Sequence, residues 1–172
     1  MTFSARRLRA ADAEAYRALR LEALQVSPES FGASLAEEEA RPFTAFVERL
    51  ERSFMFGLFD SVTLVGTAGF FREDGVKNAH RGRLVGVYLT PPARGKGNAS
   101  LLIGAVIEEA RKHVLQLHLA VIQQNEKARR LYERHGFRTY GEDPRGLQTD
   151  GVFYDDYLMV LRLDEGGTES EV

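Results

Sequence analysis

The chain of 172 residues contains no cysteine and no tryptophan. The absence of cysteine excludes disulfides, thiolate metal sites and a cysteine nucleophile. No apolar run approaches the roughly 20 residues that a membrane-spanning helix needs. The first ten residues, MTFSARRLRA, lack the apolar core of a signal peptide. We therefore expect a cytoplasmic protein with no membrane partner.

An excess of charge of one sign is also missing. The net charge is −2, so no strong overall field attracts nucleic acid, and we expect no nucleic-acid partner. The composition, 44% hydrophobic and 28% charged, is ordinary for a globular protein, and the length suits one domain. We expect a single domain over residues 1–163. The segment 164–172, DEGGTESEV, has little to bury and is expected to be an acidic, flexible tail.

Hydrophobic periodicity predicts strands alternating with helices, and therefore a mixed α/β or α+β fold. Two polar segments, ESFGASLAEEEARP at 29–42 and GEDPRGLQTDG at 141–151, are expected outside the sheet, the second as a loop. Helices are expected after the capping residues Asp12 and Asn125, over 42–52, and after the stretch PPARGKGNAS. Strands are expected over 3–8, 54–59, 63–71, 84–89, 115–122, 137–140 and 152–163.

The stretch PPARGKGNAS, residues 91–100, lies between a predicted strand and a predicted helix. The first N–H groups of a helix have no backbone partners and carry a partial positive charge, which favours phosphate. Gly95 and Gly97 let an anion approach closely because they lack a Cβ. Arg94 and Lys96 add charge, and Ser100 adds a hydroxyl donor. A flexible surface loop would explain the same pattern.

Two common nucleotide motifs fit this stretch poorly. A Walker A loop requires GxxxxGK[ST], which is absent. A dinucleotide fingerprint requires GxGxxG, but Ser100 stands at the third glycine and the next strand ends VIQQ without a carboxylate. A nucleotide-binding domain therefore remains only a third alternative.

A second segment narrows the choice of ligand. The residues RGKGNA at 94–99 and NEKARRLYERHGF at 125–137 occur in the order and at the spacing of two motifs of the GNAT family of N-acetyltransferases. The chain resembles that family in detail over 84–140, and the predicted order of elements extends the resemblance over nearly the whole chain.

The resemblance implies a central mixed, mostly antiparallel, twisted sheet of six to seven strands flanked by about four helices. The strands at 84–89 and 115–122 would splay apart. Acetyl-CoA would be the cosubstrate, with no metal. Its pyrophosphate would bind the glycine turn, and its pantetheine arm would follow the strand ending at Leu89. The implied cofactor-binding residues are Val87, Leu89, Arg94, Gly95, Lys96, Gly97, Asn98, Ala99, Ser100, Asn125, Ala128 and Tyr132.

The implied reaction is direct attack of a primary amine on the thioester. The amide N–H of Leu89 would polarise the carbonyl, and Tyr132 matches the family's general acid for the CoA thiolate. From periodicity alone, Tyr132 would instead be a packing residue one turn from Ala128. The base cannot be read from the sequence. The candidates are a water chain and six side chains: Glu37, Glu38, Glu39, His80, Asp155 and Asp156.

The acceptor would be an amine of a small molecule or a peptide, and we expect it to contact Phe31, Glu37, Glu38 and Asp155. Asn98 departs from the family pattern, which usually has an apolar residue there. The remaining histidines lack metal-ligand spacing and are interpreted as structural; they are His113, His118 and His135.

The sequence leaves a second function open, a non-catalytic acyl-CoA-binding sensor on the same scaffold. The strand RLVGVYLT carries no carboxylate, although some family members place one there. A homodimer is common in the family, but no residue indicates one here.

Overall fold

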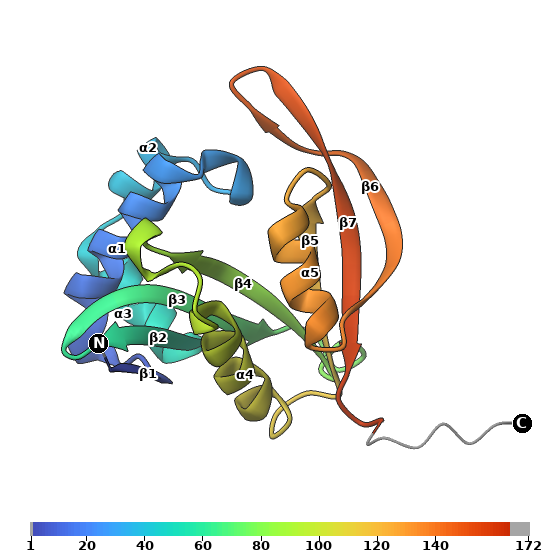
Figure 1. Cartoon of the computed structure of the whole chain (residues 1–172), viewed down its shortest axis with the longest axis horizontal. Coiled ribbons are helices and arrows are strands. Elements are labelled where there is room, and N and C mark those ends of the chain that lie inside the picture. Colours follow the sequence, from blue (N-terminus) through green and yellow to red (C-terminus); the bar gives the residue numbers. More distant parts are fainter. Residues whose placement is uncertain (1, 166–172) are drawn as a thin grey trace, which may run out of the picture.

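In the computed structural model, which describes residues 2–165, seven strands form one sheet in the order β1-β2-β3-β4-β5-β7-β6 (Figure 1). All neighbouring strands are antiparallel except β4 and β5, which are parallel. The mixed, mostly antiparallel sheet predicted from the sequence is therefore confirmed. The strands are β1 (Phe3–Arg7), β2 (Phe54–Asp60), β3 (Thr63–Arg72), β4 (Arg81–Leu89), β5 (Gln116–Ile122), β6 (Arg138–Thr149) and β7 (Val152–Arg162).

Among residues 2–165, five α-helices flank the sheet, one more than predicted. The additional helix is α2, which forms inside the polar segment 29–42 because Ser34 and Glu37 make a reciprocal capping box at its start. The helices are α1 (Ala13–Val26), α2 (Leu35–Glu39), α3 (Phe43–Arg52), α4 (Asn98–Ala110) and α5 (Glu126–Arg134), with short 3₁₀ turns η1 (Ala10–Asp12), η2 (Pro28–Ser30) and η3 (Pro91–Ala93).

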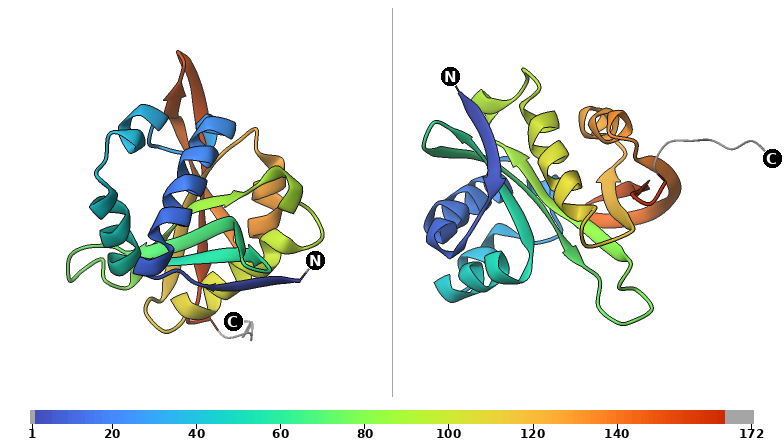
Figure 2. Two further views of the ribbon diagram at one scale, coloured as in Figure 1. Left: turned by 90° about the vertical axis from the view of Figure 1, so that its left-hand side faces the viewer. Right: turned by 90° about the horizontal axis from the view of Figure 1, so that it is seen from below.

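The helices cover both faces of the sheet. Figure 2 shows α1 and α3 on one side and α4 and α5 on the other. Met55 of β2 packs in the cluster that contains Phe46 of α3, whereas Leu58 packs in the cluster that contains Leu102 of α4. Because both faces of β2 are buried, its sequence is a continuous apolar run rather than an alternation.

The parallel strands β4 and β5 pair over only three residues each. Arg81–Arg83 lie opposite Gln116–His118, and no further pairs join the two strands. Beyond that point they diverge, as Figure 1 shows, so the predicted splay is confirmed. A bulge in β4 at Gly86, which has φ +65°, shifts its register against β3 on the other edge. The Thr67 hydroxyl donates to the Gly86 carbonyl at 3.0 Å and holds this bulge.

The prediction of a loop over 141–151 is wrong. β6 continues to Thr149 and pairs with β7 through two register shifts. The shift between Asp143 and Leu147 absorbs the Pro-Arg-Gly insertion as a bulge, so proline does not end the strand. The chain reverses instead at Asp150-Gly151, both with positive φ, which is the Asp-Gly signal of a tight hairpin.

Two smaller expectations concern the chain's ends and its relation to a membrane. No helix within residues 2–165 is long and apolar enough to cross a membrane. The flexible tail predicted for 164–172 lies outside the described residues from position 166 onward.

Glu38 on α2 is buried, with 1% of its surface exposed, and three arginines surround it. Arg49 of α3 donates two hydrogen bonds of 2.9 Å, Arg20 of α1 donates one of 3.2 Å, and Arg41 lies at 3.0 Å. Burial by itself raises the pKa of Glu38, but the hydrogen bonds and charges of Arg49 and Arg20 outweigh burial and lower that pKa to about 2. Glu38 therefore joins three helices as a permanent anion. This corrects the hypothesis that it is a base or an acceptor ligand.

We expect the substitution Glu38→Gln to lower the free energy of unfolding at pH 7 by about 3 kcal/mol, because it leaves buried guanidinium groups without their counter-ion. The folded-state pKa lies below the ordinary value, so this contribution is complete above about pH 4.5 and is lost as the pH falls towards 2. Urea unfolding of both proteins at pH 7 and pH 3 measures the difference. A stability gap that is as large at pH 3 as at pH 7 would contradict this account.

Candidate active site

A cavity of about 460 Å³ opens where β4 and β5 diverge. Residues 84–87 of β4 and 119–122 of β5 form its opposite walls. One end is lined by Asn125, Ala128, Leu131 and Tyr132 at the start and along the face of α5. The other end is lined by Arg20, by residues 29–32 around η2, and by the β6–β7 hairpin. Two groups approaching from these two ends would meet between the strands.

The start of α5 is fixed by Asn125. Its side-chain oxygen accepts a hydrogen bond of 3.1 Å from the Ala128 amide, so the predicted cap is confirmed. Asn125 also lines the cavity, and the structure gives its side-chain amide nitrogen no partner among residues 2–165. That N–H₂ group is therefore available to a ligand.

Tyr132 lies one turn beyond Ala128 along α5 and is 6% exposed. Its ring makes an edge-to-face contact with Phe137 at 5.7 Å between centroids, so it packs and lines the cavity at once. Burial raises the pKa of the Tyr132 hydroxyl above its usual value, so this hydroxyl stays protonated at neutral pH. A protonated hydroxyl therefore lies in the lining of the cavity.

The glycine turn immediately precedes α4, the longer of the two helices on the α5 side of the sheet. Gly95, Lys96 and Gly97 all have positive φ, and α4 begins at Asn98. In the part of the chain that the structure describes, no protein group accepts a hydrogen bond from these three amides. No atom lies within 4 Å of the position a Cβ would occupy at Gly95 or Gly97. Free amides and open space at a helix N-terminus suit a phosphate group.

The side chains of the turn are partly used by the fold. The Arg94 guanidinium donates to the Leu89 carbonyl at 3.0 Å, and Asn98 donates to the Ala93 carbonyl at 2.8 Å. The buried Asn98 thus holds the turn to η3, which explains why a polar residue replaces the family's usual apolar one. Ser100 contacts His135 at 2.7 Å and thereby ties α4 to α5.

Only some of the residues that the sequence predicts for the site line the cavity. The cavity lining includes Phe31, Val87, Asn125, Ala128 and Tyr132. Leu89 is not in the lining and lies opposite Gly66 of β3. The β4 bulge instead brings Gly86 and Val87 to the cavity.

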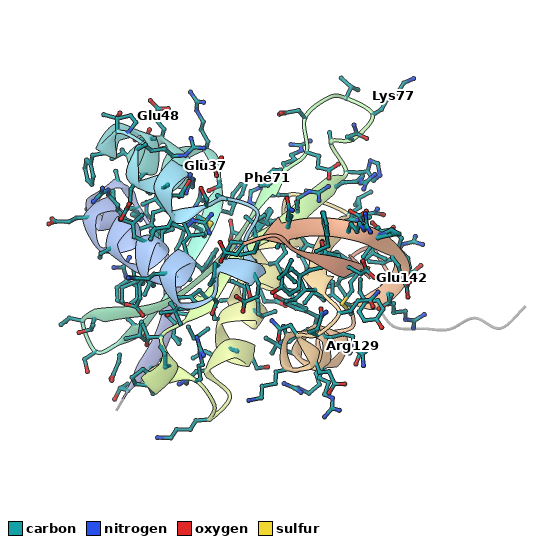
Figure 3. All side chains as sticks on the ribbon, turned by 90° about the horizontal axis from the view of Figure 1, so that it is seen from above. Glu37, Glu48, Phe71, Lys77, Arg129 and Glu142 are labelled. Atoms are coloured by element: carbon teal, nitrogen blue, oxygen red, sulfur yellow. The ribbon has the colours of Figure 1, made fainter. Side chains whose placement is uncertain are left out.

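Most of the predicted acidic groups lie elsewhere. Glu37 caps α2 on the helical side of the molecule, away from Glu142 of β6 (Figure 3). His80 lies beside a separate shallow pocket with Arg72 and His113. Asp155 is exposed and accepts a hydrogen bond of 2.8 Å from the Arg145 amide in the β6 bulge, so it is not part of the cavity.

Asp156, the next residue along β7, does line the cavity, since adjacent strand residues point to opposite faces. Its Oδ1 is buried and has no hydrogen-bond partner in the described structure. Burial raises the pKa of Asp156 above its usual value, and the negative charges of Asp143 and Asp155 raise it further. Of the six side chains considered as a base, Asp156 is the one that the cavity contains.

The sequence does not indicate Arg20, Glu29 and Arg83, which also line the cavity. They come from three separate segments, and no local motif marks them. Within residues 2–165 no group of three or more histidine, aspartate or glutamate side chains could hold a metal ion.

Comparisons with known proteins place this geometry in context. The sequence model of the acetyltransferase (GNAT) family matches residues 16–137. A search of curated proteins found no match.

Several solved structures are similar in fold. An acetyltransferase of the GNAT family from Streptococcus pneumoniae superposes with a TM-score of 0.80 at 24% identity, covering 94% of this chain and 99% of that one. Ribosomal-protein-alanine N-acetyltransferase from Brucella melitensis gives 0.78 at 22% identity, covering 92% and 99%. A phosphinothricin acetyltransferase from Sinorhizobium meliloti, solved in complex with acetyl-CoA, gives 0.78 at 20% identity, covering 99% and 95%.

Proposed function

The chain belongs to the acetyltransferase (GNAT) family, and on that premise we propose that it transfers the acetyl group of acetyl-CoA to a primary amine. One observation carries this proposal: the cavity between β4 and β5 has a buried, protonated tyrosine at one end and, at the other, the half-buried carboxylate of Asp156, whose Oδ1 has no hydrogen-bond partner among the described residues. A proton donor for the departing thiolate and an acceptor for the amine's proton are the two groups that direct acyl transfer requires.

The cofactor would bind along the face that carries α4 and α5. Its pyrophosphate would accept hydrogen bonds from the free amides within residues 95–99, with the charge of Lys96 nearby, whereas the Asn98 amide already donates to the Gly95 carbonyl. Beyond Arg83 the edge of β4 that faces β5 has no strand partner, so the amides of the pantetheine arm can pair with it as an added strand would. Asn125 offers its free amide nitrogen to the same arm.

We expect Gly97→Val to weaken CoA binding about tenfold, because a branched side chain would fill the open space and strain a backbone with φ +78°. Titration calorimetry with CoA measures the change. Gly75→Val is the matched control, since Gly75 also has positive φ and open space around it but lies in the loop between β3 and β4. Equal affinities in the two variants would refute the placement of the pyrophosphate.

In the proposed reaction, the ammonium group of the acceptor gives one proton to Asp156, directly or through water, and the neutral nitrogen attacks the thioester carbon. The carbon–nitrogen bond forms, the carbon–sulfur bond breaks, and the sulfur takes a proton from the Tyr132 hydroxyl. The second proton that the nitrogen must lose returns, through water, to the Tyr132 phenolate. An amide of the β4 bulge would polarise the carbonyl. We assign this role to Val87 rather than Leu89, because Val87 lines the cavity.

We expect Tyr132→Phe to lower kcat about 100-fold while the Kd for CoA changes less than about twofold, because only the proton donor is removed. Steady-state kinetics and CoA titration provide the two values. Tyr140→Phe is the control, since Tyr140 contacts His118 outside the cavity. A parallel loss of turnover and affinity would show that Tyr132 acts only in packing.

The test of the function is release of free CoA thiol from acetyl-CoA in the presence of a panel of amines. Acceleration by an amine, with the acetylated amine identified by mass spectrometry, is the expected result. Binding of CoA without acceleration by any amine would favour the acyl-CoA sensor. Binding of NAD or ATP without competition from CoA would favour a nucleotide-binding domain.

The acceptor amine would belong to a small molecule or a peptide. We further propose that residues 1–163 act as one catalytic domain. All seven strands, from β1 at residue 3 to the end of β7 at residue 162, belong to one sheet, which supports this boundary.

A further inference from the structure

Four charged side chains line the cavity, and their charges balance. Arg20 and Arg83 are positive, whereas Glu29 and Asp156 are negative. A lining with an excess of carboxylates would best bind an acceptor that carried only an ammonium group. A balanced lining suits a molecule that carries both charges.

We propose that the acceptor is a small amine that also carries an anionic group, with Asp156 binding its ammonium group and Arg20 binding the anionic group. This inference rests on the proposed function and specifies its substrate class.

Arg20 is held in place but has most of its donors free. Its side chain is 15% exposed, its Nε–H donates to Glu38, and its guanidinium carbon lies 5.0 Å from the centre of the Phe31 ring. Its other four N–H groups have no acceptor among the described residues. A fixed guanidinium with free donors can bind a carboxylate, phosphonate or phosphate through two parallel hydrogen bonds.

Glu38 does not neutralise Arg20. The single negative charge of Glu38 is shared among Arg20, Arg41 and Arg49, and Arg49 alone takes two of its hydrogen bonds. The cluster therefore keeps a surplus of positive charge, and Arg20 is the member of it that lines the cavity. An anionic group on the acceptor would meet this surplus.

The β6–β7 hairpin, at the same end of the cavity as Arg20, provides carboxylates that suit a cation. A Cβ on Gly146 would lie 2.8 Å from Oδ2 of Asp156 and 3.0 Å from Oδ2 of Asp143, so the two carboxylates are within about 6 Å of each other. Asp143 and Asp156 are directly opposite in the β6–β7 ladder. Their mutual repulsion is relieved when an ammonium group binds beside them, and the unpartnered Oδ1 of Asp156 gains a donor.

The other two charged side chains of the lining, Arg83 and Glu29, contribute less to binding an acceptor. Arg83 is half exposed and is already bound to Glu73 at 3.0 Å, and Glu29 belongs to the short turn η2. A peptide N-terminus differs from the proposed acceptor because a neutral carbonyl, not an anionic group, lies next to its amine. Arg20 would then have no partner on the substrate.

The test uses matched acceptors with acetyl-CoA as donor. The twenty L-amino acids are compared with their carboxamides and with the amines that lack the carboxylate, and 4-aminobutyrate is compared with butylamine to sample a longer spacing. Release of CoA thiol gives kcat/KM for each. The best acid-bearing amine should exceed its carboxamide about 30-fold, the value of a charged hydrogen-bonded pair.

Two arginine variants then locate the anion site. Arg20→Gln should bring the ratio of acid to carboxamide close to one, and Arg20→Lys should retain part of it. The ratio does not depend on the fraction of folded enzyme, so loss of a Glu38 contact cannot produce this result. Arg17→Gln is the control on the same helix, since Arg17 lies outside the cavity, and it should leave the ratio unchanged.

The ammonium site is tested by Asp156→Asn, which should lower kcat/KM for acid and carboxamide alike, by about 100-fold. A greater loss in Asp155→Asn than in Asp156→Asn would overturn the placement of the ammonium group.

Three further results separate the inference from the function. Preference for carboxamides or peptide N-termini would overturn the inference and leave acetyl transfer intact. A ratio unaffected by Arg20→Gln would do the same. Failure of every amine to be acetylated, with CoA bound, would refute the proposed function and the inference together.

Discussion

The separation of β4 from β5 after three paired residues is the constraint on which the site depends. Two parallel strands in an ordinary sheet would satisfy each other's backbone groups along their whole length. Here the facing edges remain unpaired, and a cavity takes the place of the missing ladder. The bulge at Gly86 turns β4 at this point, while α5 and η2 close the two ends. A ligand that contributes its own amides can complete the sheet, so binding and fold use the same hydrogen-bonding groups.

The two ends of the cavity are stabilised in different ways. At the α5 end, the Asn125 cap and the contact between Tyr132 and Phe137 orient one helix. At the other end, the Glu38 ion cluster joins α1, α2 and α3, and η2 reaches across to contact β5 and β6. The charged residues around Arg20 are therefore part of the fold before they meet any ligand. A rigid, charged wall costs little reorganisation when an acceptor binds.

Some features of the fold and of the site can be predicted from the sequence, and others cannot. The glycine turn and the segment from Asn125 to Phe137 were identified correctly, because helix starts, caps and left-handed glycines are local features. The strand predicted at 137–140 forms the start of β6, but its continuation to Thr149 was missed, because Pro144 and Gly146 usually end strands and only pairing with β7 shows that a bulge absorbs them. Which of Asp155 and Asp156 lines the cavity depends on the face of β7 from which each side chain projects. The other walls of the cavity come from segments far away in the sequence. The role of Glu38 depends on Arg20 of α1 and Arg49 of α3, which belong to other helices, together with Arg41 just after α2.

The sequence by itself determined the order of the elements, the glycine turn before α4 and the tyrosine-bearing helix, since each depends on contacts within a few residues. Membership of the GNAT family follows from those motifs. The tertiary structure alone decided which carboxylate lies in the cavity, that Glu38 is a buried counter-ion, and that Arg20 and Asp156 line the same cavity. The physical reason is that burial, pairing and charge balance arise between segments far apart in the chain, and no periodicity along the chain records them.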